Sequence, residues 1–297
     1  MKLKVALGLL LFFTAGTLKA DPFKEPLCFK NSVDFWESVY TKYGQNQTIF
    51  HNDRTFEIYK VATIPPPGNK QRKRALKAIK RELKKTLSSS EFMSLHAQAG
   101  VKERFMKGLD IGKKLIPQMQ KQFTSQNMPG DLALIPLIES SFQFNAKSRV
   151  GARGAWQIMP ATLRLYKKVH KNKLNGLDFS TAIAILIFQD NYENLHSWPM
   201  SINAYHSGLG RLLKASKQLN TNDMCEITTK YTGRGYRFAS RNYYAQFLAA
   251  KRVYYKGSKK IESKVDPTSN INYDDLRKSL NEAIDKCNKD PECREEN

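Results

Sequence analysis

The side chain in this sequence whose setting points most clearly to chemistry is Glu139. It directly follows the apolar run LALIPLI at 132–138. A carboxyl group at the edge of an apolar core loses hydration, which disfavours its charged form and raises its pKa. A carboxylic acid that stays protonated near pH 7 can donate a proton to the oxygen of a glycosidic bond. This position therefore predicts a general acid, although an isolated glutamate after an apolar helix is more often a cap or a surface ion pair.

The residues that follow this glutamate carry groups suited to sugar binding. Ser148 supplies a hydroxyl, and Gly151 and Gly154 allow the backbone to approach a ligand closely. Gln157 supplies an amide that can both donate and accept hydrogen bonds. Trp156, next to it, is predicted to lie in the core or in the wall of a cleft rather than to stack on a sugar. Together these residues predict a carbohydrate site around the acid.

The segment from Glu139 to Pro160 resembles the catalytic domain of the lytic transglycosylases, a family related to goose-type lysozyme. The family pattern runs from Glu-Ser, through a Ser nine residues on, to Gly-Ala-x-Gly-x-x-Gln-x-Met-Pro. This sequence matches the pattern at Glu139-Ser140, Ser148, Gly151-Ala152, Gly154, Gln157, Met159 and Pro160. The resemblance implies a lysozyme-like helical domain that cleaves the glycan strands of peptidoglycan. It also implies that Glu139 is catalytic and that the substrate is bound by Ser148, Gln157 and Met159.

A second block, SWPMSINAYHSGLGRL at 197–212, resembles the Ala-Tyr-Asn-x-Gly block of the same family. His206 stands where most members have Asn. An imidazole can still donate and accept hydrogen bonds there, but it adds a group that titrates near neutral pH. The resemblance implies that Tyr205 and His206 contact the substrate.

A third block, FASRNYYAQFLAAKRVYY at 238–255, is similar to a segment in which the family often carries Glu-Thr-Arg-x-Tyr. The Arg and the Tyr remain as Arg241 and Tyr243, but Ala239 replaces the Glu. The resemblance implies that the Tyr243 hydroxyl lies in the cleft near the acid and binds substrate. The loss of the Glu leaves the role of Arg241 open.

The resemblance extends over about residues 32–255. The third block, VDFWESVYTKY at 33–43 and the predicted hairpin after it place the likeness closest to the membrane-bound lytic transglycosylase D-like branch. Relatives in that branch often add LysM glycan-binding repeats, which the tail at 256–297 does not show. Affinity for the wall is therefore expected to come from the cleft and from net charge.

Most glycosidases use two carboxylates, but the matched blocks contain one. Asp178, Asp190 and Glu193 lie between the blocks and are interpreted as solvated or N-terminal helix charges. The resemblance implies that the substrate supplies the nucleophile. Glu139 would protonate the oxygen between N-acetylmuramic acid and N-acetylglucosamine, and would then accept the proton of the muramyl C6 hydroxyl as a 1,6-anhydro ring closes. No metal and no organic cofactor is expected.

Three other functions stay open. A goose-type-lysozyme-like hydrolase would use the same glutamate with water as the nucleophile. A non-catalytic wall-binding module would not need Glu139, Ser148 and Gln157, all of which are intact. A nucleic-acid binder would suit the charge, but the sequence has no recognisable nucleic-acid motif. The expected partners are therefore peptidoglycan glycan strands and no nucleic acid, and the chain is expected to act as a monomer.

The chain is strongly basic. Its 297 residues include 49 Lys and Arg against 27 Asp and Glu, a formal net charge of +22. An exported protein with this balance is expected to meet an anionic surface, whether cell-wall polymer, lipid headgroups or nucleic acid. The densest basic stretch, 70–85, has apolar residues at helical spacing, which favours a packed helix with a solvated basic face over a dedicated anion-binding strip. These apolar residues are Leu76, Ile79, Leu83 and Leu87.

The first twenty residues predict a cleaved signal peptide, because two lysines precede an apolar run and small residues precede Asp21. Asp21, not Cys, stands directly after the predicted cut, so no lipid anchor is expected. No later stretch is apolar enough to predict stable membrane insertion. The expected location is the periplasm or the cell exterior.

Export makes two disulfides the expected state of the four cysteines. The turn-forming Asp-Pro pair in CNKDPEC favours Cys287 with Cys293 and leaves Cys28 with Cys225, out of three possible connectivities. Free buried thiols are the alternative. Zinc is disfavoured because the sequence has no CxxC or HxxxH spacing.

The predicted fold is mainly α, with a small α+β lead-in. Four segments are predicted: the signal peptide at 1–20, an α+β region with a Pro-rich linker at 21–69, a helical lysozyme-like domain at 70–255, and a polar tail at 256–297. The elements predicted outside the helical domain are a helix at 32–43, strands at 48–50 and 56–62, and one tail helix suggested by Leu276, Leu280 and Ile284.

Overall fold

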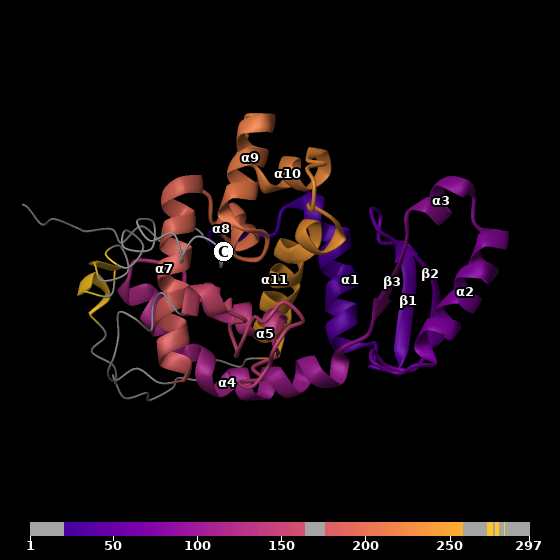
Figure 1. Cartoon of the computed structure of the whole chain (residues 1–297), viewed down its shortest axis with the longest axis horizontal. Helices are drawn as coiled ribbons and strands as arrows, with labels where there is room; N and C mark the ends of the chain where they lie inside the picture. The colour runs from indigo at the N-terminus through magenta and orange to yellow at the C-terminus, as the bar shows by residue number, and fades with distance from the viewer. Residues whose placement is uncertain (1–20, 164–175, 258–271, 276, 279–281, 283–297) are drawn as a thin grey trace, which may run out of the picture.

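The computed structural model describes residues 21–163, 176–257, 272–275, 277, 278 and 282. Three predictions lie outside these residues: the signal peptide at 1–20, the Cys287–Cys293 disulfide, and Leu276, Leu280 and Ile284 of the tail helix. In the described part, helices form most of the molecule and three strands form one small sheet (Figure 1). The prediction of a mainly α fold with a small α+β portion is therefore confirmed.

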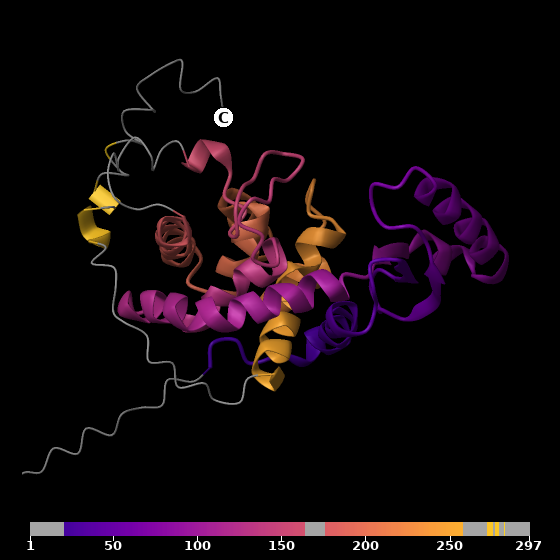
Figure 2. The same cartoon turned by 90° about the horizontal axis from the view of Figure 1, so that it is seen from below.

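The larger part of the molecule is a body of helices. It comprises α4 (Lys102–Ser125), η2 (Gly130–Leu134), α5 (Ile135–Glu139), α7 (Leu177–Leu195), α8 (Trp198–Ser207), α9 (Leu209–Leu219), α10 (Met224–Lys230) and α11 (Phe238–Gly257). The long helix α4 runs along the lower edge of this helical body in Figure 1 and crosses the body lengthwise in the view from below (Figure 2). It packs against η2, α5 and α7. None of the described helices is both long enough and apolar enough to span a bilayer.

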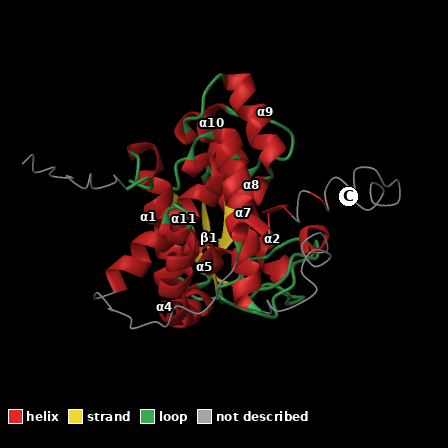
Figure 3. Ribbon diagram, turned by 90° about the vertical axis from the view of Figure 1, so that its left-hand side faces the viewer, coloured by secondary structure: helices red, strands yellow, loops and turns green. Residues whose placement is uncertain are grey.

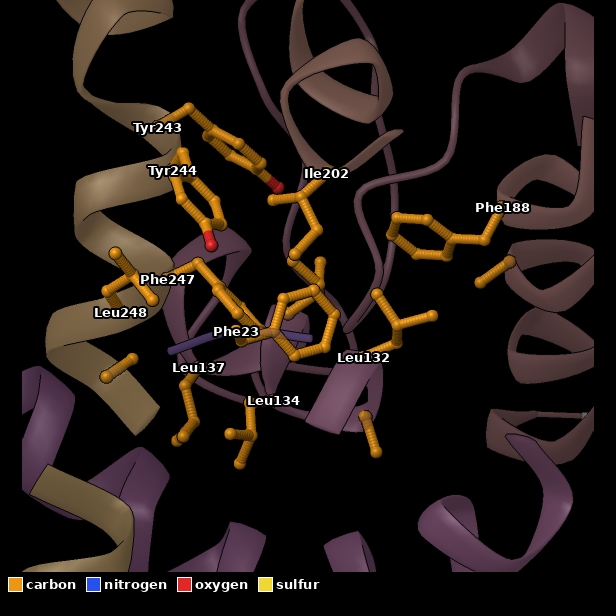
Figure 4. Close-up of a cluster of buried hydrophobic side chains, with 14 of the residues drawn as sticks. Phe23, Leu132, Leu134, Leu137, Phe188, Ile202, Tyr243, Tyr244, Phe247 and Leu248 are labelled. Carbon is orange, nitrogen blue, oxygen red and sulfur yellow. The ribbon is translucent and has the colours of Figure 1, made fainter. Parts of the chain in front are cut away.

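The apolar run before Glu139 lies in the core of the helical body. Leu132, Leu134 and Leu137 are 0%, 0% and 1% exposed. Figure 4 shows these leucines close to Phe247 of α11, with Ile202 of α8 in the same cluster. Burying a leucine side chain contributes about 1.5–3 kcal/mol, so this run holds α5 firmly against α11.

The smaller part, which we call the sheet unit, lies beside the helical body. It comprises β1 (Gln47–Asn52), β2 (Ile58–Thr63), α2 (Arg72–Thr86), α3 (Ser89–Met93) and β3 (Leu95–Ala99). The strand order is β2-β1-β3, with both pairs antiparallel. In Figure 3, which faces the α7 side, the strands lie behind the helices of the body.

The predicted hairpin is confirmed, although its second strand begins at Ile58. The prediction that the chain is helical from residue 70 onward misses β3. Five residues carry too weak a local pattern to indicate a strand. β3 exists because Leu95–Ala99 pairs with β1, which lies far upstream in the chain.

One face of α2 covers the sheet. Leu83 of α2 packs with Phe50 and Ile64 in a separate small core, and Leu76 and Ile79 join it. The Lys and Arg side chains on the other face are exposed. The prediction of a packed helix with a solvated basic face is therefore confirmed.

Helix α1 (Lys30–Thr41), preceded by η1 (Leu27–Phe29), packs against α11 and α4 of the helical body. Its Phe35 ring also packs on His51 of β1, with ring centroids 4.2 Å apart, so α1 joins the two parts. The predicted helix at 32–43 is confirmed. Tyr40 of α1 stacks on Phe105 of α4, with ring centroids 4.1 Å apart. The Cys28–Cys225 disulfide fastens the segment before α1 to α10, so that predicted pairing is also confirmed.

Candidate active site

Glu139 is the last residue of α5, and the backbone after it turns sharply. Ser141 and Phe142 both have left-handed conformations, with φ of 54° and 55°. The turn packs tightly on α4, because a Cβ atom on Gly108 would lie 2.6 Å from the Ser141 carbonyl oxygen. Ser140 Oγ donates to the Ala155 carbonyl at 2.8 Å and ties the turn to the next loop. The backbone turn after Glu139 is thus packed against α4 on one side and bonded to the next loop on the other, and this fixes the position of the Glu139 side chain.

The carboxyl group of Glu139 faces Tyr243 of α11. The Tyr243 hydroxyl donates to Glu139 Oε1 at 2.6 Å, and Tyr243 itself is only 4% exposed. Burial raises the pKa of Glu139 to about 7, although the hydrogen bond from Tyr243 opposes the rise by stabilising the carboxylate. The upward shift predicted from the apolar run is confirmed. At neutral pH this group can both donate and accept a proton.

Tyr205 of α8 lies on another side of the site. Its hydroxyl donates to the Trp156 carbonyl at 2.8 Å, and its ring stacks on Phe188 of α7. Burial, and after it the nearby Glu139 charge, raises the pKa of Tyr205 well above its usual value. Tyr205 therefore braces the loop that follows the acid.

Trp156 belongs to the core. It is fully buried, and its indole N–H donates to Thr181 Oγ1 at 3.0 Å. The prediction that Trp156 is core or wall rather than a stacking platform is confirmed.

The loop that carries Ser148, Gln157 and Met159 is braced by its own hydrogen bonds. Ser148 Oγ accepts from the Ala152 N–H at 3.0 Å. Gln157 has a left-handed backbone with φ of 50°, and its Nε2 donates to the Gly154 carbonyl at 2.8 Å. Met159 is 44% exposed. The polar side chains shape this loop, whereas Met159 offers an apolar surface to solvent.

His206 packs on the residue that touches the acid. Its ring stacks on Tyr243 with centroids 4.5 Å apart and planes 15° apart, and the residue is exposed. Loss of hydration against its neighbours, and after it the charge of Arg211, lowers the pKa of His206. The imidazole therefore contacts the site through Tyr243.

Arg241 pairs with Asp53, which sequence reasoning did not find. Arg241 Nη2 lies 2.7 Å from Asp53 Oδ2 in the turn between β1 and β2. Sequence alone offers no signal for the pair, because the two residues are 188 positions apart. The charge of Arg241 is thus neutralised by a residue outside the third block, and the pair links the sheet unit to α11.

A second residue that sequence reasoning missed is Asn203 of α8. It is fully buried, and its Nδ2 donates to the Ser240 carbonyl at 2.7 Å. A buried amide between apolar residues is the signal that could have found it. The bond fixes α8, which carries Tyr205 and His206, to the start of α11.

The other carboxylates near the motif blocks are engaged elsewhere. Asp178 accepts a hydrogen bond from Gln122, and Asp190 and Glu193 both pair with Arg277. Within the described residues, no cluster of three or more His, Cys, Asp or Glu side chains has the geometry of a metal site.

Residues 117–227 match the family model of the transglycosylase SLT domain. This segment is a transglycosylase SLT domain. It contains Glu139, the braced loop after it and the block around His206, whereas Tyr243 lies beyond its end. The matched segment therefore includes the candidate acid and most of the residues around it.

Two curated proteins are similar to this chain over part of their length. The membrane-bound lytic murein transglycosylase D of Escherichia coli (strain K12) is 34% identical over 100 residues, which cover 32% of this chain and 22% of that protein. A protein of Alteromonas sp. (strain M-1) named for tributyltin chloride resistance is 34% identical over 95 residues, which cover 30% of this chain and 45% of that protein. The alignments thus span less than half the length of either relative.

Among solved structures, an inactive mutant of the lytic transglycosylase Slt from Pseudomonas aeruginosa aligns with 47% of this chain and 24% of its own chain. The TM-score is 0.37 at 19% sequence identity.

Proposed function

We propose that this chain is a peptidoglycan lytic transglycosylase that cleaves the β-1,4 bond between N-acetylmuramic acid and N-acetylglucosamine and leaves a 1,6-anhydro end. The observation that carries the proposal is the setting of Glu139 within an SLT domain. Its carboxyl group has a pKa of about 7 and accepts a hydrogen bond from a buried tyrosine. A group of this kind can act first as an acid and then as a base in one turnover.

In the first step, protonated Glu139 donates its proton to the glycosidic oxygen, and the bond between that oxygen and the muramyl C1 breaks. In the second step, the C6 hydroxyl of the same muramyl residue attacks C1, and the Glu139 carboxylate accepts the hydroxyl proton. The ring closes, the enzyme regains its starting protonation state, and no water is consumed. Tyr243 stabilises the carboxylate between the two steps by donating to Oε1.

The isolation of Glu139 favours the substrate as nucleophile. Two-carboxylate glycosidases place the second group beside the scissile bond. In the described part of the chain, the influences on the pKa of Glu139 are burial and Tyr243, with no second carboxylate among them. A goose-type-lysozyme-like hydrolase, in which water attacks C1, uses the same single acid and is separated from the proposal by its product.

The other residues have positioning and binding roles in this proposal. Ser148 and Gln157 hold the loop after the acid, and Met159 contacts the glycan with its exposed side chain. Tyr205 supports the same loop from α8. His206 stacks on Tyr243, the tyrosine that contacts the acid. In this proposal His206 also borders the bound sugar. The mechanism requires no metal or cofactor.

The proposed partners are peptidoglycan glycan strands, and the proposed location is the periplasm or the cell exterior. The excess of basic residues, with a net charge of +22, suits an anionic wall and needs no nucleic-acid partner. The chain is proposed to act as a monomer without stable membrane insertion.

Digestion of purified sacculi, followed by mass spectrometry of the released muropeptides, tests the proposal. The expected products end in 1,6-anhydro-N-acetylmuramic acid and are one water lighter than their hydrolysed counterparts. Reducing ends instead would establish the hydrolase. Sacculus binding without release by the folded protein would establish a non-catalytic wall-binding module. Glu139→Gln protein, purified in parallel, controls for contaminating enzymes.

A further inference from the structure

The exposed face of α2 carries a dense patch of positive charge. At 3.6 residues per turn, seven basic residues of this helix fall within an arc of about 140° and along about 18 Å of its axis. They are Lys73, Arg74, Lys77, Lys80, Arg81, Lys84 and Lys85, all of them exposed. We call this set the basic face of α2.

Little in the structure neutralises this face. Glu82 is the one acidic residue of α2, and it pairs with Lys60 of β2, Nζ to Oε1, at 2.5 Å. Among the residues that the structure describes, no ion pair joins a carboxylate to any of the seven. The basic face therefore presents its charge to an external partner.

The basic face is also held in a fixed orientation. The opposite side of α2 is anchored on the sheet through Leu83 and its neighbours, so the helix cannot roll to bury its lysines. Beside it, α3 ends with Met93, an apolar side chain that is 83% exposed. Figure 1 places α2 and α3 at the end of the molecule opposite α7, with α5 and its terminal Glu139 in the helical body between.

We propose that the basic face of α2 docks the protein on the surface of an anionic lipid bilayer. Clusters of four to eight Lys and Arg on an amphipathic helix bind anionic headgroups through long-range attraction. Because the apolar side of α2 is occupied by the sheet, binding is electrostatic and peripheral. The face consists of Lys and Arg, and the aromatic ring recorded against it, that of Phe92 in α3, is half-buried and lies 6.0 Å from Lys84 Nζ rather than forming an open platform on which sugars or nucleic-acid bases stack.

Docking in this manner goes beyond glycan cleavage and does not depend on it. The catalytic residues lie in the helical body, away from the docked face, so the site would stay accessible to a glycan while the sheet unit rests on the bilayer.

Vesicle co-sedimentation of the full chain tests the proposal. One vesicle population contains phosphatidylglycerol and phosphatidylcholine, and the other contains phosphatidylcholine alone. Binding is expected to the first only and is expected to weaken as NaCl rises. Replacing Lys73, Lys77, Lys80 and Lys84 with Gln should lower the partition coefficient at least tenfold and up to about 600-fold, since each of the four basic residues near an anionic surface contributes up to about fivefold.

A matched variant removes the same charge from another helix. Lys102, Lys107, Lys114 and Lys121 are exposed along α4, and their replacement with Gln should change vesicle binding less than twofold. Gln keeps high helix propensity in both variants, and melting temperatures verify that both are folded.

Equal losses in the two variants would mean that net charge, not the basic face, attracts the bilayer, and would overturn the proposal. It is also overturned if anionic vesicles are not bound, or if the α2 variant loses affinity for sacculi or single-stranded nucleic acid but not for vesicles. The activity of the α2 variant on a neutral glycan oligomer should equal that of the unmodified protein, which separates this test from that of the catalytic function.

Discussion

Glu139 and the lysines of α2 are ionisable side chains that the fold treats in opposite ways. The carboxyl group of Glu139 borders a core of leucines and aromatic rings, and burial moves its pKa to about 7. The lysines of α2 lie on a solvated helix face and stay exposed. Burial makes the single carboxyl group of Glu139 reactive, whereas exposure lets the charges of many lysines add up to one positive electrostatic field.

The difference also separates what each region contributes to stability. Folding opposes ionisation of Glu139, because its pKa rises from 4.5 to about 7. The unfavourable contribution is absent below pH 4.5, where the carboxyl is protonated in both states, and is complete above pH 7. A rise of this size corresponds to roughly 3 kcal/mol at most. The helical body therefore accepts a stability cost at neutral pH.

The largest expected effect is that of Glu139→Gln on activity. The amide keeps the shape of the side chain and can accept the hydrogen bond from Tyr243, but it has no proton to transfer. Release of anhydro-muropeptides should fall by about 10²–10⁴-fold or more. Near-normal turnover by the folded variant would contradict the assignment of Glu139 as acid and base.

The same variant tests the stability side of the comparison. At pH 8, Glu139→Gln should unfold at higher temperature than the unmodified protein, by an amount equivalent to about 1–3 kcal/mol. The gain should disappear as the pH approaches 4.5. A pH-independent difference in melting temperature would show that the carboxyl is not desolvated in the folded state.

Tyr243→Phe should have the next largest effect on activity. Without the donated hydrogen bond the pKa of Glu139 rises further, since the charged form loses a partner. The acid form then persists to higher pH, so the alkaline limb of the kcat/KM profile should move upward in pH. The rate at the optimum should fall about tenfold, which corresponds to 1.4 kcal/mol of lost transition-state stabilisation. A fall in rate with an unmoved limb would assign Tyr243 to packing alone.

Asp53→Asn tests the link between the two regions. The Arg241–Asp53 pair is largely buried, with side chains 11% and 25% exposed, so its loss should lower stability by about 2 kcal/mol. Glu226→Gln, which breaks the exposed Lys230–Glu226 pair within α10, is the matched control and should leave the melting temperature unchanged. Equal effects of the two variants would mean that the sheet unit is not fastened through this pair.

His206→Asn should have the smallest effect. The pKa of His206 is lowered, so the ring is neutral at pH 7 and the variant should match the unmodified protein there. At acid pH a protonated imidazole beside Tyr243 would favour the carboxylate form of Glu139 and slow the proton-donating step. The variant should therefore have a flatter acid limb. An unchanged profile with a lower melting temperature would mean that His206 acts only by stacking.

Much of the site could be predicted because its signals are local. The run 132–138 indicates both the core and the shifted pKa of Glu139, since a short apolar stretch before a carboxylate is enough to imply desolvation. Trp156 as core and α2 as a packed basic helix follow in the same way from neighbouring residues and helical spacing. The Cys28–Cys225 pairing followed from pairing the other two cysteines within a short loop.

Only the tertiary structure decided the contacts between distant segments. β3 is a strand because it pairs with β1, and Arg241 finds Asp53 because the hairpin packs beside α11. The stacking of His206 on Tyr243 likewise requires α8 and α11 to meet. Propensity and spacing act over a few residues, whereas these contacts join residues far apart in the chain, and the burial of a shared core determines which of them meet.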